Sequence, residues 1–378
     1  MAEQDFPVTE FENRTAHAQA LMHAQGLDAL FFTSEAEVRY FTGFRTLFWQ
    51  SPTRPWFLIV PSTGKPIAVI PQIGAHLMQA TWLEDIRTFP APHPTDEGIS
   101  QLTDALSNFT RIGMPMGRES TLRMPLHDFQ KLMSLLPKSQ FSDCTRLIQR
   151  LRQVKSEAEI AILRDICGIA SRSFAKAKTL FHEGQTLRDA FQVFKTNLLQ
   201  EGADDVPYLV GGAGQGGYGD VISPPSDQRL MAGDVLMLDT GATLKGYLCD
   251  FDRNFAIGTA SDPVRAAHRA LVEAVEAAAE IARPGKTCAD LFKAMTDRLG
   301  QTDGDVGRMG HGLGMQLTET PSITDFDQTP LRENMVLTLE PSINLGDGKM
   351  MVHEENIVIR DGAPEWLSTP SPPEIPVI

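Results

Sequence analysis

Residues 235–255 read VLMLDTGATLKGYLCDFDRNF, in which an apolar run ends at an acid and a second apolar run leads to another. Asp239 directly follows four apolar residues, where an unpaired charge in a buried strand would be very costly. A similar run, 335–339, leads straight into Glu340. These carboxylates at the ends of apolar strands therefore predict that something cationic lies beside them.

Hairpin geometry would bring such acids together in pairs. A turn centred on residues 244–245 would place Asp239 opposite Asp250, with their Cβ atoms roughly 4.5–5.5 Å apart. A three-residue loop, 346–348, would in the same way place Glu340 opposite Glu354. Carboxylates this close need a counter-charge, and two divalent cations would supply it.

His311, in a Gly-His-Gly-Leu-Gly segment, is a fifth candidate ligand. Each candidate also has a simpler interpretation. Asp250 could form an ordinary ion pair with Arg253, Glu354 could join Glu355 at a solvated strand edge, and His311 could cap a turn. The coincidence of all five favours a metal site.

Five segments in register carry a family resemblance: 238–242, 246–255, 310–314, 339–343 and 353–356. In this order they resemble the ligand motifs of the pita-bread metallopeptidases, which include methionine aminopeptidase, prolidase, Xaa-Pro aminopeptidase and creatinase. Carried over residue by residue, the resemblance implies these metal ligands: Asp239, Asp250, His311, Glu340 and Glu354.

Upstream segments extend the resemblance over nearly the whole chain. Residues 154–160 resemble the entry to the catalytic domain, and residues 26–30 and 38–44 resemble the creatinase/prolidase N-terminal domain. We therefore expect an α/β N-terminal domain over residues 1–150. A pita-bread α+β domain with a curved, mainly antiparallel sheet is expected over residues 151–378.

Periodicity and capping signals place several elements. The expected helices span 11–25, 156–181, 186–201, 263–282 and 288–299, and the expected N-terminal strands span 29–32, 56–60 and 67–70. The proline-rich tail, 370–376, should be extended without a fold of its own.

The chain departs from the peptidases at two positions. They carry a histidine near a Pro-Ser-Asp segment, where this chain has Ile222, and another seven residues after the metal-binding histidine, where it has Thr318. Ordinary dipeptide hydrolysis is therefore in doubt. His353 is a possible substitute, but strand alternation turns it away from the face of Glu354.

The glycine-rich stretch 211–219 lacks the Gly-Lys-Ser/Thr ending of a phosphate loop and is expected to form a flexible wall of the cleft. Polar side chains at its end could contact substrate. The expected substrate-binding residues are Tyr218, Asp220, Ile222, Arg253 and Thr318. The aromatic and basic segment 48–56 is either a surface loop or part of a pocket wall, possibly that of a neighbouring subunit, because relatives of this architecture are usually dimers.

Composition limits the function classes. A net charge of −14 disfavours nucleic acid and anionic membranes as partners. The sequence contains neither a signal peptide nor a run of about 18 apolar residues, so a cytoplasmic location is expected. The cysteines lack CxxC spacing and should be free thiols: Cys144, Cys167, Cys249 and Cys288. Cys249 neighbours Asp250 but should point to the other face.

The expected activity is metal-assisted hydrolysis of a C–N bond in a small or dipeptide-like substrate, with Glu340 as the acid/base carboxylate. Two divalent ions are expected, chosen among manganese, iron, cobalt and zinc because the ligands are oxygen-rich with one imidazole. Two alternatives stay open. One is a relative with other chemistry, such as creatinase-like or ectoine-hydrolase-like amide cleavage or metal-assisted elimination. The other is a non-catalytic binding protein.

Overall fold

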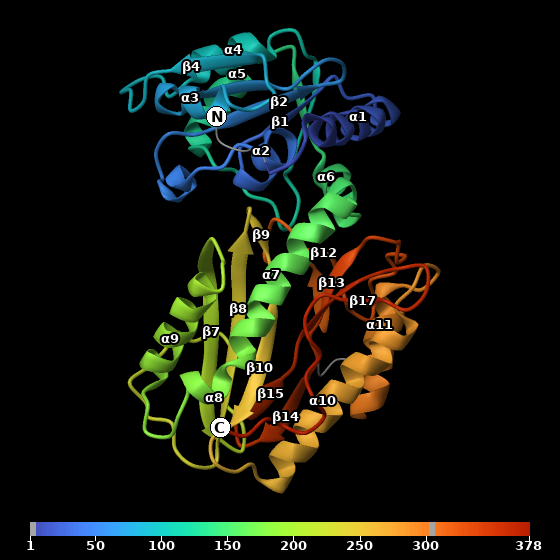
Figure 1. Cartoon of the computed structure of the whole chain (residues 1–378). Helices are drawn as coiled ribbons and strands as arrows, with labels where there is room; N and C mark the ends of the chain where they lie inside the picture. The colour runs from blue at the N-terminus through green and yellow to red at the C-terminus, as the bar shows by residue number, and fades with distance from the viewer. Residues whose placement is uncertain (1–4, 302–306) are drawn as a thin grey trace. The chain divides into compact units, whose positions relative to one another are not determined.

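A computed structural model describes residues 5–301 and 307–378 (Figure 1). The chain divides into two compact units, the first extending to Arg152 and the second beginning at Gln153. Each unit has its own sheets and core.

The first unit is built on a six-stranded mixed sheet with the order β4-β3-β2-β1-β5-β6. Its strands are β1 (Ala29–Phe32), β2 (Phe57–Pro61), β3 (Ile67–Pro71), β4 (Asp85–Phe89), β5 (Arg111–Met114) and β6 (Gln140–Asp143). The β1–β2 and β2–β3 pairs are antiparallel, and the outer pairs are parallel. The nearly continuous apolar character of β1 to β3 follows from burial on both faces of the sheet.

The helical segments of this unit are α1 (Val8–Gln25), α2 (Glu35–Thr42), η1 (Leu47–Gln50), η2 (Gln72–Gly74), α3 (Ala75–Met78), α4 (Ile99–Leu106), α5 (Leu126–Leu135) and α6 (Thr145–Gln153). Leu102 and Leu132 on α4 and α5 pack with Phe31 and Ile59 of the sheet in one apolar core. The expected α/β class of the N-terminal part is confirmed.

The second unit contains three antiparallel sheets. The first sheet joins β7 (Asp205–Gln215), β8 (Asp234–Leu244), β9 (Tyr247–Leu248) and β10 (Phe251–Ala256). The second joins β11 (Gly310–Gly312), β12 (Glu319–Ser322), β13 (Val336–Leu339), β16 (Glu355–Val358) and β17 (Glu365–Trp366). The third is the hairpin of β14 (Ser342–Gly346) and β15 (Lys349–Val352). This arrangement confirms the expected pita-bread class.

Helices cover one side of these sheets (Figure 1). Helices α7 to α9 lie beside β7 and β8, and helices α10 and α11 lie beside the C-terminal strands. Their bounds are α7 (Glu157–Ala175), α8 (Ala177–Leu180), α9 (Leu187–Gln200), α10 (Asp262–Ile281) and α11 (Cys288–Leu299). Ser156 and Glu159 form the predicted capping box that opens α7. The expected single helix over 156–181 instead breaks at Lys176 between α7 and α8.

The glycine-rich stretch differs from the expected flexible wall, because most of it belongs to β7. At Gly211 no larger residue would fit. Its φ is +154°, and a Cβ atom at this position would lie 2.1 Å from the carbonyl oxygen of Met237 on the paired strand. The glycines therefore allow close strand contact.

The C-terminal tail is extended, as predicted, but it is held along an edge of β10. Val377 bridges Ala256 in parallel, and the Ile378 amide donates to the Ala256 carbonyl oxygen. The tail thus adds backbone hydrogen bonds to the sheet beneath the candidate site.

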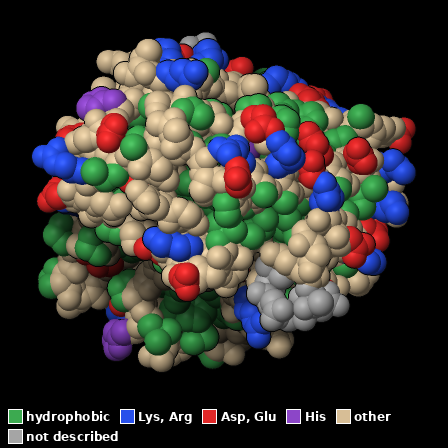
Figure 2. Space-filling view, turned by 90° about the horizontal axis from the view of Figure 1, so that it is seen from below, with side chains coloured by type: hydrophobic (Ala, Val, Ile, Leu, Met, Phe, Trp, Pro, Cys, Tyr) green, Lys and Arg blue, Asp and Glu red, His purple; other side chains and the backbone are tan. Residues whose placement is uncertain are grey.

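The helices that the structure describes include none long and apolar enough to cross a membrane. On the face seen in Figure 2, acidic and basic side chains are interspersed among apolar ones. This mixed surface differs from the clustered basic patch typical of nucleic-acid-binding proteins.

Candidate metal centre

The five predicted ligands lie on or directly beside strands of two sheets, and the expectation that Asp239 ends its strand is wrong, because β8 continues to Leu244. Asp239 lies within β8, Asp250 lies between β9 and β10, and His311 lies on β11. Glu340 directly follows β13, and Glu354 directly precedes β16. The apolar residues before Asp239 and Glu340 are buried, so β8 holds Asp239 in the protein interior, whereas Glu340 is partly exposed at the end of β13.

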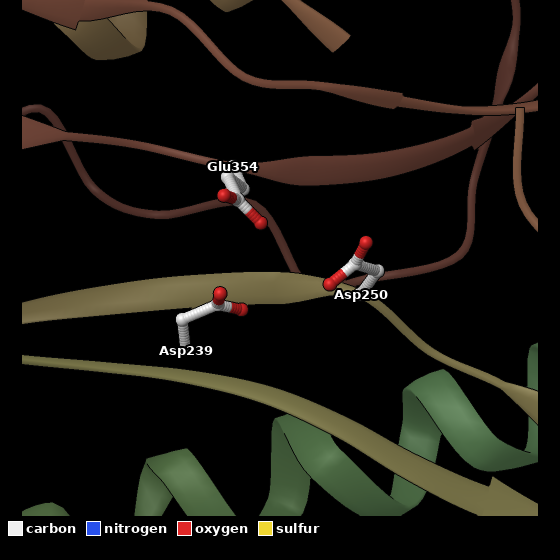
Figure 3. A group of neighbouring side chains, drawn as sticks. All are labelled: Asp239, Asp250 and Glu354. Atoms are coloured by element: carbon white, nitrogen blue, oxygen red, sulfur yellow. The ribbon is translucent and has the colours of Figure 1, made fainter. Parts of the chain in front are cut away.

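The structure brings these side chains together. Asp239, Asp250 and Glu354 each offer an oxygen, and these oxygens lie within 4.8 Å of one another (Figure 3). His311 Nε2 lies 3.3 Å from Asp250 Oδ2 and 3.8 Å from Glu340 Oε2. One imidazole and four carboxylates therefore share one location.

The electrostatics of the cluster favour a bound cation. Burial, followed by repulsion between neighbouring carboxylates, raises the pKa of Asp239, Asp250 and Glu354 well above the usual range. The charge of the exposed Arg308 opposes this effect only at Asp250. Asp239 Oδ1 is also buried without a hydrogen-bond partner. Hard divalent cations would satisfy both the excess negative charge and this oxygen.

The first predicted pairing is wrong, because Asp239 lies opposite Asp252 and not opposite Asp250. The turn consists of Lys245 and Gly246, whose φ values are +48° and +78°, whereas a turn at 244–245 was expected. Asp250 still reaches the cluster because it lies in the interruption between β9 and β10.

In this interruption, the backbone groups of Asp250 form hydrogen bonds with the side chain of Asn356. The Asn356 side chain accepts from the Asp250 amide at 3.1 Å and donates to the Asp250 carbonyl oxygen at 2.6 Å. Thr338 donates to the same oxygen at 3.2 Å. These bonds join the two sheets directly behind the cluster and fix the position of one carboxylate relative to the others.

The second predicted pairing agrees with the register on both sides of the two glutamates. Leu339 pairs with Glu355 in β13 and β16, and Ser342 pairs with Val352 in β14 and β15. This register continues across the gap and places Glu340 opposite Glu354.

A second set of charged side chains lies behind the ligands. Asp252 accepts a 2.6 Å hydrogen bond from the Glu354 amide and lies 3.5 Å from His353 Nδ1. His353 Nε2 lies 3.3 Å from Glu355 Oε1. Burial alone would raise the pKa of Glu355, but Arg253 and His353 hold it at about 2. His353 thus contacts this inner layer, in agreement with its expected orientation away from the face of Glu354.

Three of the predicted substrate contacts have other partners in the structure. Arg253 is buried and donates to Glu355, Thr369 and the carbonyl oxygens of Asp252 and Glu354, so the alternative Asp250–Arg253 ion pair is absent among the described contacts. Tyr218 is fully buried, and its hydroxyl donates to Asn254.

Asp220, the third of these contacts, accepts from the amides of Ile222 and Ser223 and so shapes its own exposed turn. Ile222 is 74% exposed on this turn, and Thr318 is half-buried just before β12. Neither side chain is an acid or a base. These hydrogen bonds engage the side chains of Tyr218, Asp220 and Arg253, and their contact with substrate stays a prediction.

Tyr208, a half-buried residue on β7, joins the site although no sequence motif marks it. Burial and the charges of Asp239, Asp250 and Glu354 raise the pKa of its phenol, and a side-chain hydrogen bond couples it to Asp239. Tyr208 is hard to predict from the sequence, because the glycines after it hide the strand alternation that places it on the face of Asp239.

A two-unit chain with a pita-bread domain and a buried cluster of acids and one histidine defines a class of metal-dependent proteins. Residues 161–361 match the model of metallopeptidase family M24, and residues 14–154 match that of the creatinase/prolidase N-terminal domain. This chain therefore belongs to metallopeptidase family M24. Membership in the family implies divalent metal ions as cofactors.

Several relatives are similar along nearly their whole length. An Xaa-Pro dipeptidase of Pyrococcus furiosus is 24% identical over 92% of this chain and 95% of its own. A probable dipeptidase PepE of Mycobacterium tuberculosis is 28% identical over 96% of both chains. The crystal structure of dipeptidase PepE from Mycobacterium ulcerans matches with a TM-score of 0.85 at 25% identity over 99% of both chains.

Proposed function

We propose that this protein is a metal-dependent hydrolase that cleaves a C–N bond in a small substrate other than a proline dipeptide. The observation that carries the proposal is a cluster with its carboxylates and imidazole in place but with no acid or base at Ile222 and Thr318. The proposed metal ligands are Asp239, Asp250, His311, Glu340 and Glu354.

Divalent cations bound there would polarise a substrate oxygen and acidify a water molecule. Manganese, iron, cobalt and zinc suit four carboxylates and one imidazole. The protein side chains divide the remaining tasks. Asp239, Asp250 and Glu354 are at least nine-tenths buried and would serve as ligands. Glu340, whose side chain is 30% exposed, is the more accessible carboxylate and would move the proton between water and leaving group.

The residues at the two replaced positions would change specificity. Peptidases of the resembled family carry histidines there, which orient the scissile group and stabilise the charge that develops on it. Ile222 offers an apolar, exposed surface and Thr318 only a hydroxyl. We therefore propose a substrate with a methyl or methylene edge near Ile222.

A substrate panel tests this proposal. Manganese-, cobalt- and zinc-loaded protein would be assayed with Xaa-Pro dipeptides, longer Xaa-Pro peptides, and cyclic or guanidino amides. Loss of each charge-stabilising donor typically costs about 10²–10³ in rate. We expect proline-dipeptide turnover well below the kcat/KM of about 10⁴–10⁸ M⁻¹s⁻¹ usual for an enzyme and its own substrate.

The double variant Ile222→His/Thr318→His provides the matched comparison. It should gain proline-dipeptide activity relative to the native chain, because it restores an imidazole at both positions where the peptidases carry one and leaves the cluster unchanged. Efficient Xaa-Pro hydrolysis by the native protein would instead make it an ordinary prolidase. The homodimer expected from the resemblance stays a prediction, which light scattering of the purified protein would test.

A further inference from the structure

Tyr208 shares the sheet face that carries the cluster. In the β7–β8 ladder Val210 pairs with Asp239 and Tyr208 pairs with Gly241. Paired residues point to the same side of a sheet, as do residues two apart on one strand. Tyr208 is thus the diagonal neighbour of Asp239, a separation that an aromatic side chain can span.

An irregularity in β7 sets this alignment. The β7–β8 register shifts by one residue between Asp205, which pairs with Thr243, and Tyr208. Pro207 lies in this irregular stretch and has no amide proton to donate to the ladder. Bulges of this kind re-aim side chains and are frequent beside active sites.

Tyr208 and Leu317 both lie against Gly241. A Cβ atom on Gly241 would lie 3.1 Å from Tyr208 Cβ and 2.5 Å from Leu317 Cδ1. Leu317 immediately precedes Thr318, one of the two positions that lack a histidine. The phenol is only half-buried, whereas the other strand tyrosine of this sheet, Tyr247, is fully buried.

We propose that Tyr208 is a catalytic residue of this site, whose phenol redirects its single O–H from Asp239 to the oxygen of the bound carbonyl or amidine-like group as negative charge develops there. The proposal rests on the proposed hydrolytic function. The phenol keeps its proton throughout, so no bond to hydrogen is broken in this role. A phenol normally titrates near 10, so the donor keeps its proton at neutral pH. Donors aimed at developing charge act in this way in many hydrolases.

The test uses Tyr208→Phe, which removes only the hydroxyl, and inorganic phosphate as a tetrahedral oxyanion probe. Cobalt-loaded native and variant proteins would be compared for cobalt content, melting temperature, visible cobalt spectrum and phosphate Kd by calorimetry. We expect the variant to keep its cobalt and to bind phosphate roughly 10–100-fold more weakly, because a hydrogen bond to a charged group is lost. With a substrate from the panel, kcat should fall while KM changes little.

Tyr247→Phe is the matched control, since its hydroxyl donates to Glu159 at 2.9 Å and not to the cluster. This control should bind phosphate as the native protein does. Unchanged phosphate affinity in Tyr208→Phe, equal weakening in both variants, or loss of cobalt from Tyr208→Phe would each overturn the donor role. Absence of metal from the native protein would instead overturn the proposed function itself.

Discussion

Two neighbouring aspartates of the same strand region have different surroundings. Asp250 points its carboxylate at His311 and the other acids, whereas Asp252 accepts from the Glu354 amide and from the Asn254 side chain. The side chain of Asp252 therefore holds a ligand-bearing segment in place. The position of each aspartate, and not its acidity alone, therefore determines whether its carboxylate faces the cluster.

Asparagine substitutions test this distinction. Asp250→Asn should abolish binding of at least one metal ion, because a charged oxygen ligand is lost. Asp252→Asn should keep the metal stoichiometry but weaken affinity about 10–100-fold, the usual cost of changing a group that orients a ligand. Metal analysis and a chelator competition titration measure both quantities. Equal loss of stoichiometric metal in the two variants would contradict the assignment.

At the scale of elements, the loop before β12 is organised by one buried carboxylate. Glu319 Oε1 accepts from the amides of Met315 and Gln316, and Glu319 Oε2 lies 3.2 Å from Lys155 Nζ. A Cβ atom on Gly314 would lie 2.9 Å from the same carboxylate. The loop that presents Thr318 is therefore wrapped around Glu319, whose charge Lys155 balances.

Removing one partner of this ion pair should lower the free energy of unfolding substantially. Lys155→Met leaves Glu319 charged and buried, and breaking a buried pair in this way typically costs about 3–5 kcal/mol. Lys293→Met, which breaks the exposed Lys293–Asp297 pair within α11, is the control and should change stability by less than about 1 kcal/mol. Urea unfolding measures both free energies. Similar values for the two variants would show that the buried pair does not hold the loop.

Local signals in the sequence were sufficient for most elements. The predicted strand at 29–32 and the helix at 288–299 coincide with β1 and α11, because a short apolar run favours the strand and a capping box with helical periodicity favours the helix. The convergence of the five ligands could be anticipated from acids that follow apolar runs. The register of the first hairpin could not be anticipated from the sequence, because it depends on which residues adopt positive φ in the turn.

Longer-range contacts explain the remaining differences. Asp250 reaches the cluster only because the Asn356 side chain, 106 residues away, replaces a strand partner for its backbone. Tyr208 is aligned by an irregularity in β7, and the glycines after it obscure the alternation. Arg253 is predicted to contact substrate or Asp250, but its guanidinium donates to Glu355 and to the Thr369 carbonyl oxygen. Such partners are not encoded by spacing along the chain.

At the scale of the whole molecule, the cluster makes the catalytic unit depend on its cations. Four carboxylates and a second buried group of Asp252 and Glu355 concentrate negative charge between the two sheets, and Arg253 and His353 are the basic partners that contact Glu355. Cations bound by the folded state alone would add stability according to their concentration relative to Kd.

Removal of the metals should therefore lower the melting temperature at neutral pH. At a free metal concentration about 100 times Kd, one bound ion stabilises the folded state by about 2.7 kcal/mol. In a domain of this size such a change corresponds to roughly 5–10 °C. Calorimetric scans before and after treatment with a chelator, with metal content measured on the same samples, provide the comparison. Re-addition of manganese or cobalt should restore the transition, which separates loss of the ion from damage by the chelator. A purified protein that holds no transition metal, and whose melting curve a chelator leaves unchanged, would show that the five residues do not form a metal centre.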